Sequence, residues 1–140
     1  MGLIDIANDI RVTINSLTSR KLELERKIQE YQGMNNSING VIGCLQSATG
    51  DVARASGMVK SNYRDSKRAS NTISELSGKQ AEIGSIIGIL RTALAASNKK
   101  IQELRSKRET VIEQIGSYQQ RLEQTLNAIA VENANKGQYL

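Results

Sequence analysis

The chain of 140 residues has no proline, histidine, tryptophan or phenylalanine, and it has one cysteine. Without proline, the usual helix breaker is missing from the whole length. Without histidine, the commonest general base and metal ligand are missing, and Cys44 has no imidazole to activate it. We therefore expect no enzyme activity, no catalytic residue, no metal site and no cofactor. Because Cys44 lies in an apolar run, we expect a buried thiol.

Long hydrophobic runs are also missing. No segment reaches the roughly 18 consecutive apolar residues that a membrane-spanning helix needs. The first residues, MGLIDIANDI, lack the basic and apolar regions of a secretory signal. We expect a chain that is cytoplasmic at synthesis, with no cleavable signal peptide and no membrane span.

The apolar residues that are present recur in steps of three and four, which is helix periodicity close to a heptad. Two such patterns mirror each other around a polar centre. They predict an all-α fold, a long antiparallel helical hairpin in one domain of residues 1–140. Its arms are expected at about 3–59 and 73–133, and its turn at about 60–72.

Besides the turn, two other positions could interrupt the helices. Ser61, Asn62 and Asp65 favour a turn or a helix N-cap within 60–72. Gly50 and Gly78 could each introduce an extra break.

The segment 83–97, IGSIIGILRTALAAS, is apolar around most of a helix. Such a helix needs more than one neighbour, so we expect association with another helical chain or a homodimer. The half of the hairpin nearest the turn should provide the contact. The predicted partner-binding residues are Val41, Ile42, Leu45, Val52, Tyr63, Ile83, Ile86, Ile87, Leu90 and Leu94.

Glycines stand among these apolar residues, three of them seven residues apart. Glycine inside a helix costs up to about 1 kcal/mol relative to alanine. Repetition at one heptad position therefore favours a groove that receives another helix, with fraying or a break at Gly50 as the alternative. The segment has neither the lysine nor the preceding strand of a phosphate loop. The residues assigned to close helix packing are Gly43, Gly50, Gly57, Gly84 and Gly88.

The net charge of +5 is concentrated between residues 60 and 100, where eight bases accompany three acids. Elsewhere acids and bases balance, as in Glu23/Lys27 and Glu103/Lys107, which have the i,i+4 spacing of helix-surface ion pairs. We do not expect nucleic-acid binding, because only Tyr63 could stack and no recognition motif is present. The basic residues near the turn are Lys60, Arg64, Lys67 and Arg68.

The two charged arms, IRVTINSLTSRKLELERKIQEYQ and IQELRSKRETVIEQIGSYQQRLEQ, flank a small-residue middle. This pattern resembles the WXG (ESAT-type) superfamily of small helical-hairpin proteins. It is nearest to the YwqH-like and other small proteins associated with LXG toxins of Gram-positive type VII secretion. The resemblance implies a non-enzymatic adaptor, targeting factor or chaperone that binds a toxin's helical N-terminal region or a sister small helical protein. It also implies export in complex through a type VII system.

Two motifs of that superfamily are absent. The chain has no W-x-G turn, and Tyr63 is the nearest counterpart. It has no Y-x-x-x-[DE] export signal either, because Leu122 stands four residues after Tyr118 and Asn35 four after Tyr31. A partner would then supply the export signal.

A second, local resemblance is to the signalling domain of chemoreceptors. The segment NTISELSGKQAEIGSIIGIL is similar to the helix that approaches the tip of those domains. It supports an alternative function, a self-associating structural or signalling coiled coil of phage or chemoreceptor type.

Overall fold

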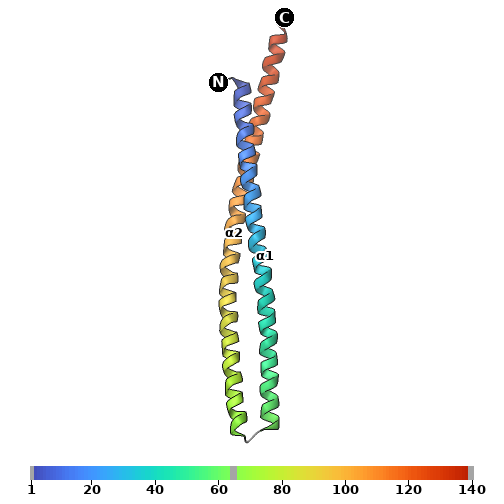
Figure 1. Ribbon diagram of the computed structural model, residues 1–140. Coiled ribbons are helices and arrows are strands. Elements are labelled where there is room, and N and C mark those ends of the chain that lie inside the picture. Colours follow the sequence, from blue (N-terminus) through green and yellow to red (C-terminus); the bar gives the residue numbers. More distant parts are fainter. Residues whose placement is uncertain (1, 64–65, 139–140) are drawn as a thin grey trace. The chain divides into compact units, whose positions relative to one another are not determined.

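The computed structural model describes residues 2–63 and 66–138, which form two helices (Figure 1). Helix α1 spans Leu3–Asn62 and helix α2 spans Lys67–Gln138. The two helices run in opposite directions and pack against each other, with no strand in the described ranges. The predicted all-α antiparallel hairpin is confirmed.

The turn lies inside the predicted region, but it is shorter than 60–72. The amide of Tyr63 still donates to the Val59 carbonyl at 3.0 Å, which extends the hydrogen bonding of α1. Ser66 then starts α2, since its hydroxyl accepts a hydrogen bond from the Ala69 amide at 3.3 Å. This is the contact of an N-cap residue with the third residue of its helix. Of the predicted capping residues, Asn62 ends α1, and Asp65 lies outside the described residues.

Neither predicted extra break is present. Helix α1 continues through Gly50, and α2 continues through Gly78. No described glycine has a positive φ. One glycine costs a helix about 1 kcal/mol, which is small beside the packing of apolar residues on both sides of it.

The chain divides into two compact units, and each contains a segment of both helices. Unit 1 comprises residues 1–30 and 101–140, and unit 2 comprises residues 31–100. In each unit, the less exposed residues of each helix recur in alternating steps of three and four. These are positions a and d of a heptad abcdefg, the positions that face the partner helix in a coiled coil.

We call the line of a and d contacts between α1 and α2 the seam. The seam residues of unit 1 are more deeply buried than those of unit 2. Its buried apolar residues are Ala7, Ile10, Leu24, Ile28, Ile101, Leu104 and Val111. Two basic residues, Lys21 and Arg108, also occupy seam positions and are partly buried. Their long aliphatic stems can cover apolar neighbours while the charged groups reach toward solvent. The Arg108 guanidinium lies 3.7 Å from the Glu109 carboxylate.

Unit 2 has a seam with polar interruptions. The Gln80 side-chain amide donates to the Thr49 carbonyl at 3.5 Å, and the Asn35 amide donates to Asn98 at 2.7 Å. Each bond joins α1 to α2. Polar groups at seam positions favour one register, because sliding the helices would leave those groups unpaired. These bonds therefore fix which residues of α1 lie opposite which residues of α2.

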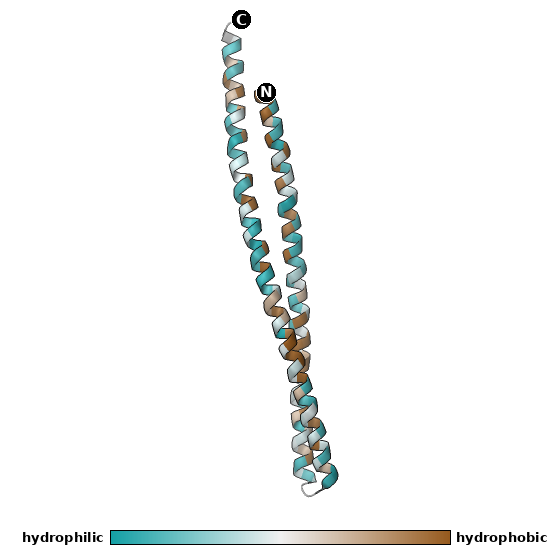
Figure 2. Cartoon of the chain, turned by 90° about the vertical axis from the view of Figure 1, so that its left-hand side faces the viewer, coloured by the Kyte–Doolittle hydropathy of each residue, from teal (hydrophilic) through white to brown (hydrophobic). Residues whose placement is uncertain are grey.

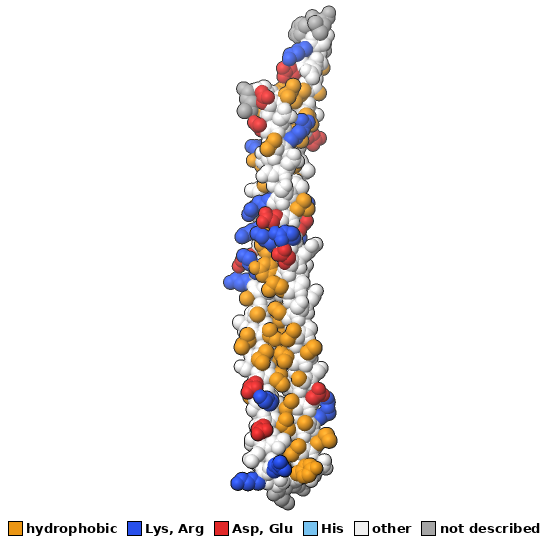
Figure 3. All heavy atoms as spheres, in the orientation of Figure 1, with side chains coloured by type: hydrophobic (Ala, Val, Ile, Leu, Met, Phe, Trp, Pro, Cys, Tyr) orange, Lys and Arg blue, Asp and Glu red, His pale blue; other side chains and the backbone are white. Residues whose placement is uncertain are grey.

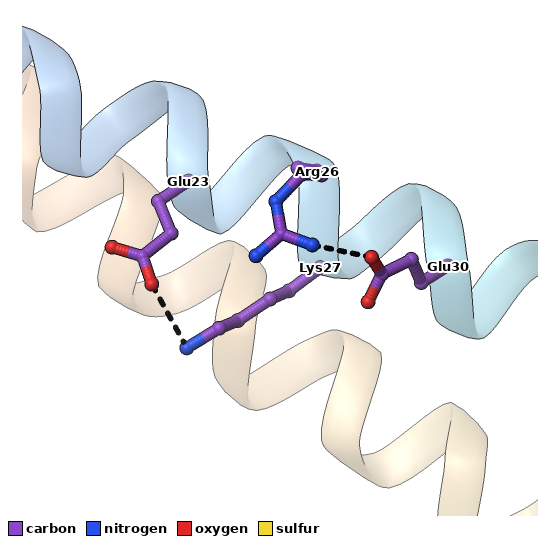
Figure 4. Close-up of polar contacts among 4 residues, drawn as sticks. All are labelled: Glu23, Arg26, Lys27 and Glu30. Atoms are coloured by element: carbon purple, nitrogen blue, oxygen red, sulfur yellow. Dashed lines mark hydrogen bonds and ion pairs between the residues drawn. The ribbon is translucent and has the colours of Figure 1, made fainter.

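Ion pairs on the helix surfaces support the arms. Glu23 and Lys27 are 3.5 Å apart, as their i,i+4 spacing predicted, and Arg26 also pairs with Glu30 (Figure 4). All four side chains are well exposed. Each pair therefore adds only about 0.3–0.5 kcal/mol to helix stability.

The unit 1 seam predicts a large difference between two leucines of α2. Replacing Leu104, which is 4% exposed, with alanine should lower the free energy of unfolding by about 2–5 kcal/mol because it leaves a cavity. Replacing Leu126, which is 40% exposed, should cost less than about 1 kcal/mol. Urea unfolding followed by circular dichroism measures both. Equal losses would contradict the seam assignment.

The cap at the start of α2 gives a second prediction. Ser66→Ala removes the oxygen that accepts the Ala69 amide and should cost about 1 kcal/mol. Ser70→Ala is the control, because Ser70 is exposed and lies inside the helix. Thermal unfolding of the two variants measures the difference. A Ser66 variant as stable as the Ser70 variant would show that another group caps α2.

Candidate interaction surface

Most of the predicted partner-binding residues contact the other helix of the same hairpin. The register of unit 2 places these seven at a and d positions, buried or partly buried. They are Ile42, Leu45, Val52, Ile83, Ile87, Leu90 and Leu94. Their first role is to hold α1 against α2.

The other three predicted residues are exposed. Val41 is 50% exposed, Ile86 is 46% exposed and Tyr63 is 62% exposed. Val41 and Ile86 each precede an a residue, so both occupy position g. Because the helices are antiparallel, the g positions of both helices lie on the same side of the seam. Tyr63 follows the last residue of α1 and is separate from this side.

Further apolar side chains extend the surface around Val41 and Ile86. Position c lies next to position g on a helix surface, and in the middle of unit 2 these two positions are apolar on both helices except at Ser37. We call this surface the unit 2 apolar face. It consists of Met34, Val41, Cys44, Ile86, Ile89 and Ala93, all of them exposed. The sequence interpretation missed Met34, Cys44, Ile89 and Ala93. The heptad phase could have identified them, since Met34 and Ala93 occupy position g, as Val41 and Ile86 do, and Cys44 and Ile89 occupy the neighbouring position c.

No charged residue lies within this face. The face ends at Asp51 of α1 and Glu82 of α2 toward the turn, and at Lys100 of α2 away from it. Figure 3 shows hydrophobic side chains without red or blue between two charged bands. The other side of the unit 2 seam is polar, with exposed residues such as Asn39, Gln46, Ser77 and Arg91. The side of the helix pair with positions g and c is therefore apolar, and the side with position e is polar.

Unit 2 is also the less covered unit. Its only buried apolar residues in the described ranges are Ile42 and Ala69. Leu45, Leu90 and Leu94 stay partly exposed although they lie in the seam. Figure 2 shows the densest hydrophobic colour nearer the turn than the chain ends. A helix pair with apolar residues at a, d and g has the pattern of a bundle of more than two helices.

The glycines do not mark close packing between α1 and α2. No atom of another residue comes within 4 Å of a Cβ built at Gly43, Gly57, Gly84 or Gly88. At Gly50 only the Arg54 guanidinium comes near, at 3.8 Å. Within the hairpin, α2 therefore does not approach these glycines. The reason is their phase, because these glycines occupy positions b and e, whereas α1 and α2 contact each other at positions a and d. A groove for a helix of another chain stays a prediction.

Cys44 is exposed, not buried as expected. The apolar run around it led to that error. Within the run, Ile42 and Leu45 occupy a and d positions, whereas Cys44 occupies position c. The helix therefore places its thiol on the unit 2 apolar face.

The basic residues near the turn are exposed at Lys60, Lys67 and Arg68, and Arg64 lies outside the described residues. Tyr63 borders two pockets there, with volumes of about 320 and 200 Å³. The larger is lined by Lys60, Ser61, Tyr63, Ala69, Ser70 and Ile73. Both pockets are wide open, so they provide no enclosed binding site.

The described residues hold no group of three Cys, Asp or Glu side chains placed to bind a metal ion. Neither helix contains a stretch long and apolar enough to cross a membrane, within the ranges described. No protein-family profile, curated protein or solved structure matches the chain. The assignment of function therefore depends on the unit 2 apolar face.

The open space around the glycines gives a third prediction. Gly43→Ala and Gly57→Ala should each raise the free energy of unfolding by about 0.5–1 kcal/mol, because alanine loses less backbone entropy in a helix. Urea unfolding of each variant measures the gain. If either substitution lowers stability, another helix must lie closer to these glycines than α2 does.

Proposed function

We propose that this protein is a non-enzymatic helical adaptor that binds another helical protein through the unit 2 apolar face. The observation that carries the proposal is the gathering of apolar, charge-free g and c positions from both helices on one side of the seam. Exposed apolar surface of this kind, bordered by polar residues, is typical of protein-binding sites. The occupant that fits two parallel ridges of apolar side chains is a helix or a helix pair.

The partner we propose is the helical N-terminal region of an LXG-type toxin of type VII secretion, or a sister small helical protein. The support for this step is the resemblance of the two charged arms and the small-residue middle to toxin-associated small proteins of that system. In this role the chain acts as targeting factor and chaperone. It covers apolar helices of the toxin and accompanies the toxin to the export machinery.

Burial on association explains how such an adaptor would bind. Val41 and Ile86 are about half exposed, and Ile89 is 67% exposed. Fully burying one such side chain contributes roughly 1.5–3 kcal/mol relative to leaving it exposed. Part of that gain offsets the entropy lost on association. Several side chains of the face must therefore be covered together, which favours a partner that is itself a long helix or a helix pair.

The fourth prediction tests this face. The variant carrying Val41→Glu and Ile86→Glu should lose at least 10-fold in copurification with a coexpressed LXG-toxin N-terminal region, because two carboxylates would be buried without partners. The matched control carries Val12→Glu and Ile112→Glu, which change exposed residues of unit 1. It should copurify like the unmodified chain. Quantified affinity purification measures both.

Substitution of Ile87 or Leu90 would not test binding, because both residues hold the hairpin together. Equal copurification of the two double variants would show that a different surface binds the toxin. Failure of the unmodified chain to bind any LXG-toxin N-terminal region from its own genome would refute the type VII role.

A further inference from the structure

We infer that unit 2 opens by itself: its two helix segments lose their contact and their helical structure together while unit 1 stays folded. Partial unfolding of this kind occurs where one part of a fold is less stable than the rest. A partner that covers the unit 2 apolar face would also hold unit 2 closed. The opening is a property of the free chain, so it does not depend on the proposed function.

The connection between α1 and α2 makes this order of opening unexpected. The connection lies inside unit 2, and both chain ends lie in unit 1. A short connection keeps the two helices close at little cost in chain entropy, and chain ends are commonly the least ordered part of a fold. A hairpin with an even seam would therefore open first in unit 1. Unit 2 opens first because its seam and its helices are both weaker.

Apolar burial is weaker in unit 2. Among the described residues, seven of the nine buried apolar side chains belong to unit 1, and the other two are Ile42 and Ala69. The seam residues Leu45, Leu90 and Leu94 remain partly exposed. Burial of apolar surface is what holds two helices together in water. Closing its seam therefore stabilises unit 2 less than it stabilises unit 1.

Glycine weakens the helices of unit 2. Eight of the eleven glycines lie in these helix segments, whereas Gly116 is the only glycine well inside a helix of unit 1. A Cβ built at seven of the eight meets nothing within 4 Å, and at Gly50 it meets only the Arg54 guanidinium. Packing within the hairpin therefore does not require these glycines. Each of them nevertheless makes the helix less stable than alanine would, because glycine loses more backbone freedom on folding.

Polar groups interrupt the unit 2 seam near its end away from the turn. The side-chain oxygens of Ser97 and Asn35 are buried without a hydrogen-bond partner among the described residues. The Asn35 amide bonds to Asn98, the residue after Ser97, so these groups lie at one level of the seam. Water solvates such oxygens when the helices separate, which favours opening. In unit 1 the one such atom described is Nε of Arg108, and its guanidinium still pairs with Glu109.

The fifth prediction is measured by hydrogen exchange and mass spectrometry on the free full-length chain. Amides of residues 38–59 and 73–94, in unit 2, should exchange about 100-fold or more faster than amides of residues 10–28 and 101–115, in unit 1. The outermost residues are left out of the comparison because helix ends fray. Low concentrations of urea should raise all the unit 2 rates together, because a cooperative opening exposes surface.

Three results would overturn the inference. They are equal rates in the two units, faster exchange in unit 1, and unit 2 rates that do not respond to urea. The last result would show separate fluctuations of single amides in place of a joint opening.

A matched pair of glycine substitutions tests whether unit 2 opens without unit 1. Gly116→Ala and Gly43→Ala both change position b, where a Cβ meets nothing within 4 Å. Gly116→Ala should slow exchange in unit 1 by about 2–5-fold, the stabilisation expected of alanine in a helix. It should leave exchange in unit 2 unchanged, because opening of unit 2 leaves residue 116 helical. Equal slowing in both units would show that the hairpin opens as one body.

Gly43→Ala should act differently. It should slow exchange by a similar factor along residues 38–59 and also along residues 73–94, because the two segments open together. It should slow exchange in unit 1 as well, since unit 1 opens only from the state in which unit 2 is already open. Slowing that is confined to residues 38–59 would refute the joint opening of the two helix segments.

The outcomes separate from those of the proposed function. If unit 2 opens by itself but no toxin region binds, the opening is retained and the adaptor is refuted. If a toxin region copurifies through Val41 and Ile86 but both units exchange alike, the adaptor is retained and the opening is refuted. If both are correct, the bound toxin region should slow exchange in unit 2, because a ligand of the closed state lowers the open fraction.

Discussion

The contact of α1 with α2 at a and d positions is the constraint on which every other feature depends. The chain has no aromatic core residue apart from tyrosine, so it cannot build a thick hydrophobic centre. It uses a thin seam of aliphatic side chains between two helices instead. In such a seam the phase of each residue within the heptad decides its environment. Ile42 is buried and Val41, its neighbour in sequence, is half exposed for this reason alone.

The two units share the contact at positions a and d but differ in the residues beside it. In unit 1, charged residues flank the contact between the helices, which contains most of the buried aliphatic residues of the described chain. In unit 2, apolar residues continue from the seam onto positions g and c, where the helix pair alone cannot cover them. This difference is why we propose unit 2 as the part that binds a partner.

The proposed helical partner would cover the unit 2 apolar face with apolar side chains of its own. Val41 and Ile86, each about half exposed, would then be buried. Covering this face would also keep it away from unrelated proteins, which reduces aggregation.

The fold could be predicted from the sequence because helix periodicity is local. Steps of three and four, the absence of proline and the polar centre were enough to predict two antiparallel helices and a turn within residues 60–72. Gly50 and Gly78 were harder to interpret. Glycine disfavours a helix locally, and only the apolar contacts on either side of it decide whether the helix continues.

The face was only partly predictable from the sequence, because the heptad phase had to be assigned among several neighbouring apolar residues. Which of several neighbouring apolar residues enter the seam depends on the register between two segments far apart in the chain. Asn35 with Asn98 and Thr49 with Gln80 fix that register through hydrogen bonds between helices. The sequence by itself determined that unit 2 has more apolar residues than one helix contact needs. The tertiary structure decided that Ile42, Ile87 and Leu90 hold the hairpin, and that Val41, Cys44 and Ile86 remain outside it.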